Sequence, residues 1–109
     1  MNDILLVLTN LPDDTSAVEL SRRLVEARAA ACVNRLAACI STYRWNNDIE
    51  TATEVPLLIK TTRAAYPRLE KLIREAHPYE LPEIIAVPLI AGLPAYLSWI
   101  DSETTVPKD

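Results

Sequence analysis

Residues 32–61 constrain the fold more than any other part of the chain, because they predict one long β-hairpin. From 32 to 45 the side chains alternate with period two and β-branched residues become frequent, which is typical of a strand. The Asn-Asn-Asp sequence at 46–48 tolerates positive φ and favours a tight turn, so a return strand is expected over 49–61. Because proline has no N–H to donate, Pro56 should mark a bulge, a break or a locally unpaired edge in that strand.

The segments on either side of the hairpin supply the rest of a small α+β domain, expected to span residues 1–109. Residues 4–8 are continuously apolar, as in a strand covered on both faces. The remaining segments are expected as a helix after the capping candidates at 13–16, a helix over 62–76, a strand over 83–90 and a short helix starting at Pro94. This order predicts a ferredoxin-like split βαβ fold, with both main helices on one face of an antiparallel sheet.

The two main helices carry recognisable caps and apolar stripes. Ser16-x-x-Glu19 matches a capping box for the first helix, and Thr61 or Thr62 is expected to cap the second. Pro67 should lie in or near the first turn of the second helix. The predicted stripes contain Ala17, Leu20, Leu24, Ala27 and Ala31 in the first helix, and Leu69, Leu72, Ile73 and Ala76 in the second.

Composition excludes several classes of function. The net charge is −4 and no run of Lys or Arg occurs, so nucleic acid is not an expected partner. A single glycine, Gly92, excludes the Gly-rich loops that bind phosphate.

No apolar run approaches the roughly 18 residues that a membrane span needs, and the first residues lack a basic region, so we expect no membrane association and a cytoplasmic location. No nucleophile–base pair is recognisable, and the chain is not expected to be an enzyme.

The long hairpin carries apolar residues on both faces, whereas a ferredoxin-like sheet has helices on only one. An apolar face of this size without a covering helix usually marks an interface, and self-association is the simplest explanation. The alternative is a twisted hairpin whose second face is lined by small side chains and contacts water.

The segment "AHPYELPEI" at 76–84 contains the only histidine, His77, with acidic neighbours that include Glu83. His77 and Glu83 are therefore candidate metal ligands, although one histidine cannot complete a transition-metal site alone. A second explanation is structural: His77 ends the helix and interacts with its last carbonyl groups, while Pro78 fixes the exit of the chain.

Other candidate residues lie along the hairpin. Cys32 and Cys39 have opposite parity on a regular strand and are expected as small core residues with free thiols. Lys60 ends an apolar run, where it either contacts an anionic ligand or extends into solvent at the sheet edge. Trp45 at the hairpin tip, with Tyr43 and Arg44 before it, is expected in a recognition surface or against a neighbouring subunit.

Several of these segments together resemble the CutA divalent-cation tolerance family. They are "EARAAACVN", "YRW" followed by a short turn, "TEVPLLIKTT", "YPRLEKLIREAHPYELPEI" and "YLSWI", in the same order and at similar spacing from about Leu6 to Ile100. The resemblance implies a ferredoxin-like fold, a trimeric assembly in which long hairpins extend the sheets between subunits, and an architecture similar to that of PII signalling proteins. It also implies a link to divalent-metal tolerance, copper above all, and partner-protein association in eukaryotic relatives.

The resemblance further implies copper ligands at the positions of Thr9, Ala76 and His77. Thr9 stands where a cysteine would, and Ala76 replaces the first histidine of a pair, so the sequence favours weak copper binding. Asn47 stands where the family often has a turn glycine, and asparagine tolerates the left-handed region. We therefore expect a homotrimer whose inter-subunit clefts bind a divalent metal or small ligand weakly, with Trp45, Lys60 and Tyr79 nearby. The alternative is an interaction scaffold or signalling protein without tight metal binding.

Overall fold

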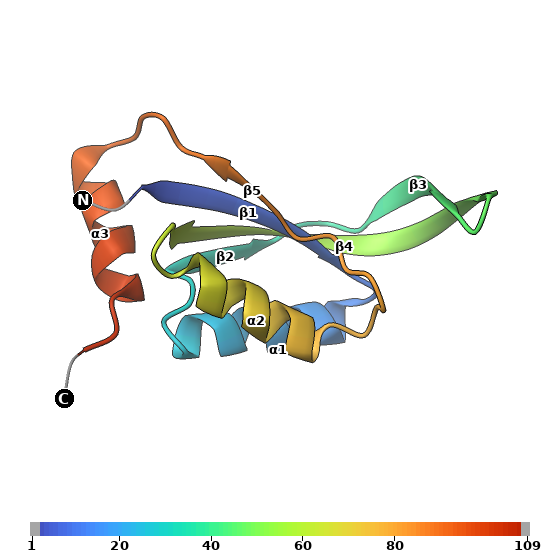
Figure 1. Cartoon of the computed structure of the whole chain (residues 1–109), viewed down its shortest axis with the longest axis horizontal. Coiled ribbons are helices and arrows are strands. Elements are labelled where there is room, and N and C mark those ends of the chain that lie inside the picture. The colour runs from blue at the N-terminus through green and yellow to red at the C-terminus, as the bar shows by residue number, and fades with distance from the viewer. Residues whose placement is uncertain (1–2, 108–109) are drawn as a thin grey trace.

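The computed structural model describes residues 3–107 and has the predicted order of strands and helices (Figure 1). The elements are β1 (Ile4–Leu11), α1 (Asp14–Glu26), β2 (Cys32–Arg35), β3 (Cys39–Trp45), β4 (Asp48–Thr62), α2 (Tyr66–Ala76), β5 (Ile85–Pro88) and α3 (Pro94–Thr104). The antiparallel strands follow the order β2-β4-β1-β5, and β3 pairs with the other half of β4. The ferredoxin-like α+β fold predicted from the sequence is confirmed.

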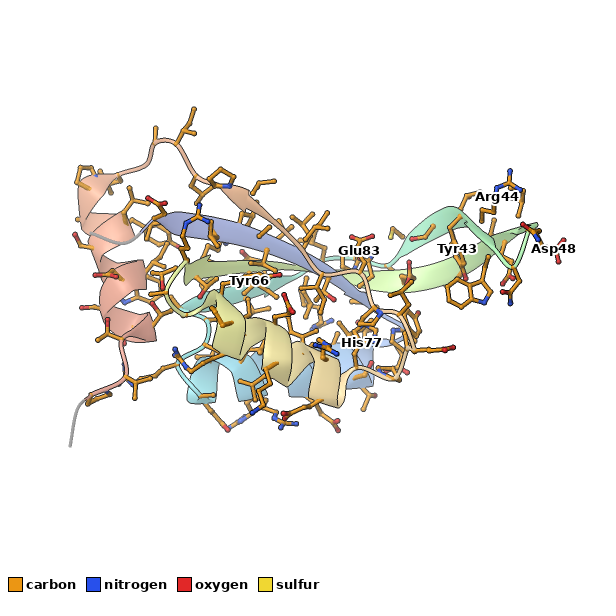
Figure 2. All side chains as sticks on the ribbon, viewed as in Figure 1. Tyr43, Arg44, Asp48, Tyr66, His77 and Glu83 are labelled. Carbon is orange, nitrogen blue, oxygen red and sulfur yellow. The ribbon has the colours of Figure 1, made fainter. Side chains whose placement is uncertain are left out.

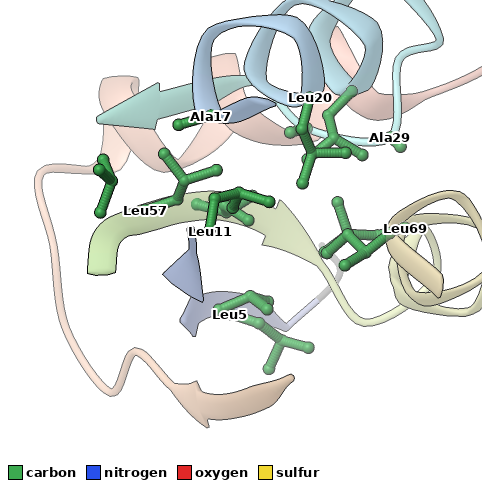
Figure 3. Packing of buried hydrophobic residues seen from close by; sticks show 13 residues of the cluster. Leu5, Leu11, Ala17, Leu20, Ala29, Leu57 and Leu69 are labelled. Atoms are coloured by element: carbon green, nitrogen blue, oxygen red, sulfur yellow. The ribbon is translucent and has the colours of Figure 1, made fainter. Parts of the chain in front are cut away.

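The hydrophobic core lies between the sheet and the two main helices, which cover the same face (Figure 1). Alternation along β1 buries Leu5, Val7 and Leu11, while Leu6 and Leu8 on the other face are only half-buried. Figure 3 shows the packing of Leu5, Leu11, Ala17, Leu20, Ala29, Leu57 and Leu69 in this layer. A smaller cluster of Ile4, Ala31 and Ile100 attaches α3 to the end of the sheet.

Helix α1 is capped by Asp13, not by the predicted capping box. Asp13 has extended backbone angles, and its carboxylate accepts a 2.8 Å hydrogen bond from the N–H of Ser16. Ser16 and Glu19 lie inside the helix, so the Ser16-x-x-Glu19 prediction is wrong. An Asp with this geometry satisfies an N–H of the first turn that would otherwise lack a partner.

The apolar stripe of α1 is shorter than predicted. Ala17, Leu20 and Leu24 are buried as expected, but the helix ends at Glu26. Arg28 then adopts a φ of 57°, the left-handed conformation that commonly follows a helix. Ala27 is therefore exposed, and Ala31 is buried beyond the helix rather than on its stripe.

Helix α2 also begins later than its predicted caps. The Thr62 hydroxyl accepts a 3.1 Å hydrogen bond from the N–H of Ala65, in the turn that precedes the helix, so neither threonine is the N-cap. Pro67 occupies the first turn as predicted. Leu69 and Ile73 are buried, whereas Ala76 is exposed and does not belong to the buried stripe.

The predicted strand over 32–45 is two strands separated by a β-bulge. Arg35 pairs with Leu57 and Cys39 pairs with Glu54, so residues 36–38 lie opposite only residues 55 and 56. The Leu36 N–H donates to the Pro56 carbonyl at 3.0 Å. Pro56 itself lies within the continuous strand β4. The bulge that was predicted at Pro56 occurs instead opposite it, at residues 36–38 between β2 and β3.

Beyond the bulge, β3 and the first half of β4 extend away from the helices (Figure 1). Asn46 and Asn47 form the turn with φ values of 50° and 69°, as a type I′ hairpin requires. The hairpin gives the molecule its long dimension of 47 Å, against 30 and 23 Å in the other directions.

The face of the sheet opposite α1 and α2 carries a group of apolar side chains beside Lys60. Leu6 pairs with Val87, and Leu8 pairs with both Leu58 and Ile85, so these side chains share a face. Val87 and Ile85 are 45% and 52% exposed. On the hairpin, where the sequence predicted an uncovered apolar surface, Ile40 and Ile49 are 68% and 62% exposed. Coverage of either surface by another subunit stays a prediction.

Within residues 3–107, no helix is both long enough and apolar enough to cross a membrane.

Candidate functional site

His77 connects the end of α2 to the end of β1. Its backbone N–H donates to the Ile73 carbonyl at 2.8 Å, and its Nε2 lies 2.6 Å from the Asn10 carbonyl oxygen. Its Nδ1 accepts a 3.1 Å hydrogen bond from the Tyr79 N–H. Since a carbonyl can only accept, the ring proton must be on Nε2. The structural explanation given for His77 therefore fits, although the ring bonds to β1 and not to the last carbonyls of its own helix.

These hydrogen bonds occupy both ring nitrogens. A metal bound at either nitrogen would have to displace Asn10 or the Tyr79 N–H, because neutral imidazole has a single lone pair in the ring plane. The side chain is only 7% exposed. Metal binding by His77 stays a prediction, and it requires the 77–79 segment to rearrange.

Tyr79 stands beside His77, with ring centroids 4.7 Å apart, and its hydroxyl forms a hydrogen bond with the Glu54 carboxylate. Burial raises the pKa of Tyr79 to about 12, with further contributions from the hydrogen bond and charge of Glu54. Glu54 is itself only 8% exposed. The contact joins the segment after α2 to the base of the hairpin.

A cavity of about 750 Å³ lies between the hairpin and the segment 78–83. Ligand sites commonly have volumes of about 300–1,000 Å³. Its walls are formed by Asn10, Ser41, Thr42, Tyr43, Trp45, Glu50, Glu54, Pro78, Tyr79, Glu80, Leu81 and Glu83. Figure 2 shows Tyr43 on the hairpin and Glu83 at the hairpin's base. The described residues that line the cavity include four glutamates and three aromatic residues but neither lysine nor arginine.

The cavity brings together some of the predicted site residues. Trp45, Tyr79 and Glu83 line it, whereas His77 lies behind Tyr79. Lys60 is elsewhere, near the other end of β4, where its ammonium contacts Asn34 and lies 3.9 Å from the Cys32 sulfur. Within one chain Lys60 therefore does not meet the other candidates, and its place in an inter-subunit cleft stays a prediction.

The two cysteines differ from their predicted arrangement. Both are free and half-buried, so neither is a core residue. Cys32 pairs with Lys60 and Cys39 with Glu54, positions that are six apart on β4. The bulge thus places both cysteines on the same face of β4, where a regular strand would have placed them on opposite faces.

Tyr43, predicted with Trp45 for a recognition surface, does line the cavity, whereas Glu54 and Glu50 were not predicted as site residues. Glu54 had a recognisable signal, because a lone carboxylate in the apolar run "ATEVPLLI" has to be paired or placed at a functional site. Glu50 and Tyr43 are direct cross-strand partners, which only the register of the hairpin reveals.

The positions implied for copper do not form a ligand set in one chain. Thr9 is fully buried, and no described residue forms a hydrogen bond with its hydroxyl. Ala76 is exposed. Among residues 3–107, no group of three or more His, Cys, Asp or Glu side chains is placed to hold a metal ion.

Comparisons with known proteins give a consistent result. The family profile described as "CutA1 divalent ion tolerance protein" matches residues 5–103. The divalent-cation tolerance protein CutA of Thermus thermophilus is 40% identical over 98 residues, which are 90% of this chain and 95% of that protein. Protein CutA of Mus musculus is 42% identical over 93 residues, 85% of this chain but only 52% of the mouse protein. The chain thus spans about half the length of that mammalian relative.

Solved structures agree with the sequence comparison. The crystal structure of CutA from Xylella fastidiosa has a TM-score of 0.92 at 46% identity, covering 94% of this chain and 99% of that chain. A CutA from Archaeoglobus fulgidus, described as a periplasmic divalent cation tolerance protein, has a TM-score of 0.90 at 30% identity, with coverage of 94% and 99%.

Proposed function

The chain belongs to the CutA1 divalent ion tolerance family, and from that premise we propose that it acts as a homotrimer with a PII-like arrangement. Its clefts between subunits bind a divalent cation such as copper, or a small ligand, weakly. The observation that carries the proposal is the part of the sheet face opposite α1 and α2 on which Leu6, Leu8, Leu58, Ile85 and Val87 lie together beside Lys60. Covering such a face by two further copies removes it from water.

The assembly is tested by measuring mass in solution. Light scattering coupled to size exclusion, at micromolar concentration, should give about three times the chain mass of 12.2 kDa. Val87→Glu should reduce that mass, because it places a charge in the proposed interface. Val25→Glu is the matched control, since Val25 is 44% exposed on α1 and Val87 is 45% exposed on β5. A monomeric wild type, or equal effects of the two variants, would contradict the proposal.

The metal-binding part is supported by Glu83, which lines the cavity close to the His77 segment. Calorimetric titration with Cu²⁺ and with Zn²⁺ should give weak binding that is reduced further in Glu83→Gln. Glu75→Gln is a control, because Glu75 lies on α2 outside this cavity. Identical heats in wild type and Glu83→Gln would show that Glu83 is not a metal ligand. Tight binding by wild type would contradict the proposal that metal binding is weak.

A second candidate function is an interaction scaffold or signalling protein without tight metal binding. It is favoured by the engagement of both His77 nitrogens and by the lack of a three-ligand group among the described residues. Tight binding of one Cu²⁺ per chain, lost in Glu83→Gln, would count against it.

The description of the family names tolerance to divalent ions and no reaction. We accordingly assign no catalytic role to the chain, and we keep the cytoplasm as its proposed location. The Archaeoglobus fulgidus relative is described as periplasmic, so fractionation of the native organism is the measurement that checks the location.

A further inference from the structure

The cavity described above carries charge of one sign on two separate walls. Glu50 and Glu54 belong to the hairpin, while Glu80 and Glu83 belong to the segment after α2. Arg44 lies on the same strand as Tyr43 and Trp45, but strand alternation directs it to the opposite side of the hairpin (Figure 2). The negative potential of the cavity therefore has no positive side chain on its described walls to balance it.

Glu54 is the group that most clearly lacks a counter-charge. Its side chain lines the cavity and is more than nine-tenths buried. The Tyr79 hydroxyl gives it one hydrogen bond but no positive charge, and no ion pair within residues 3–107 includes Glu54. A carboxylate removed from water is costly unless it is paired, so a cation that enters the cavity gains a strong partner there.

The aromatic side chains add a second preference for positive charge. Tyr43, Trp45 and Tyr79 line the same cavity, and Trp45 and Tyr43 are still 39% and 40% exposed. Ring faces attract ammonium groups, and the attraction increases where water is excluded. Exposed aromatic residues beside carboxylates therefore form a surface suited to an organic cation with an apolar body.

The described residues of one chain do not complete a metal site on these walls by themselves. A metal needs three or more donors at one point, and no such group occurs among the described residues. Carboxylates on two walls instead suit a ligand whose positive charges are separated along a chain.

We propose that the cavity between the hairpin and residues 78–83 binds a linear aliphatic polyamine, whose ammonium groups contact Glu54 and the opposite glutamates while its methylene chain packs on Trp45 and Tyr43. This inference rests on the proposed role of the cleft as a small-ligand site and names the class of ligand. It is independent of copper.

The test is calorimetric titration of the full chain with spermidine at low ionic strength. Wild type should bind, and Glu54→Gln should weaken the dissociation constant by at least about tenfold, since it removes a charge-assisted contact at nearly unchanged shape. Glu19→Gln is the matched control, because it removes the same charge from an exposed site on α1 outside the cavity. Trp45→Leu should also weaken binding, and added salt should weaken it in wild type.

Three results would overturn the proposal. The first is no heat with spermidine in wild type. The second is equal weakening by Glu54→Gln and Glu19→Gln, which would indicate a non-specific attraction. In the third, wild type does not bind spermidine and Glu54→Gln no longer assembles. This would indicate that a positive group of a neighbouring subunit pairs with Glu54. Light scattering and the copper titration on the same samples show separately whether the proposed trimer and metal binding fail.

Discussion

The two halves of β4 differ in almost every physical respect although they form one continuous strand. Residues 55–62 pair with β1 on one side, and 57–60 pair with β2 on the other, and their alternate side chains are buried under the helices. Residues 48–54 pair only with β3 and are largely exposed. The first region holds the fold together, and the second extends a surface away from it. One strand therefore contributes to the core in one half and to the exposed surface in the other.

The largest expected effect tests the stabilising half. Leu57→Ala removes a side chain that is fully buried between the sheet and the helices, and should cost about 2–5 kcal/mol of unfolding free energy. Ile49→Ala is the comparison in the exposed half, where Ile49 is 62% exposed and the expected change is within about 0.5 kcal/mol. Urea unfolding at one protein concentration measures both. Equal losses would show that the hairpin is as well covered as the core.

The next prediction concerns Tyr79, which joins the two regions through Glu54. Tyr79→Phe leaves a nearly buried carboxylate without its hydrogen bond, and should cost about 1–3 kcal/mol near neutral pH. The pKa of Tyr79 is raised from 10.0 to about 12 in the folded protein, so the neutral phenol is favoured on folding. Its contribution is complete below pH 10 and is lost as the pH rises through about 12.

The measurement is the difference in urea midpoint between wild type and Tyr79→Phe across that range. The difference should shrink between pH 10 and 12, because wild type loses the same contact by ionisation. A difference in urea midpoint that does not change with pH would mean that ionisation of the Tyr79 hydroxyl does not affect stability.

The smallest expected effect is at the hairpin tip. Asn47 has a φ of 69°, and replacement by alanine in this region should cost about 1 kcal/mol, while Asn47→Gly should be neutral or slightly stabilising. Thermal unfolding compares the two variants. A loss with glycine would mean that the asparagine side chain, rather than its backbone angle, supports the turn.

Local patterns in the sequence were enough for the order and type of the elements. The alternation over 32–45, the apolar run at 4–8 and Pro67 each predict a feature that depends on neighbouring residues only. Asp13, one of the predicted candidates at 13–16, is the N-cap, and only the capping box was wrong. All four residues suit an N-cap, and the choice among them depends on how the chain leaves β1.

What the sequence did not reveal depends on partners distant along the chain. The bulge is a difference in register between two strands, so Cys32 and Cys39 could not be placed on one face from their spacing alone. Tyr79, Trp45 and Glu83 were predicted as candidates. Glu54 was not, because its contact with Tyr79, 25 residues further along the chain, depends on the fold. Lys60 was grouped with them in a cleft between subunits. Within one chain it lies near the other end of β4, so that grouping stays a prediction.

The bulge at 36–38 has a consequence for engineering. Because the parity of the strands is reset there, the part of the hairpin beyond it can change length without altering the registration of the sheet next to the helices. Deleting two residues from β3 and their two partners from β4 would retract the tip by about 7 Å and keep the remaining side chains on their original sides. A series of such deletions would measure how far the hairpin must project to contact another molecule.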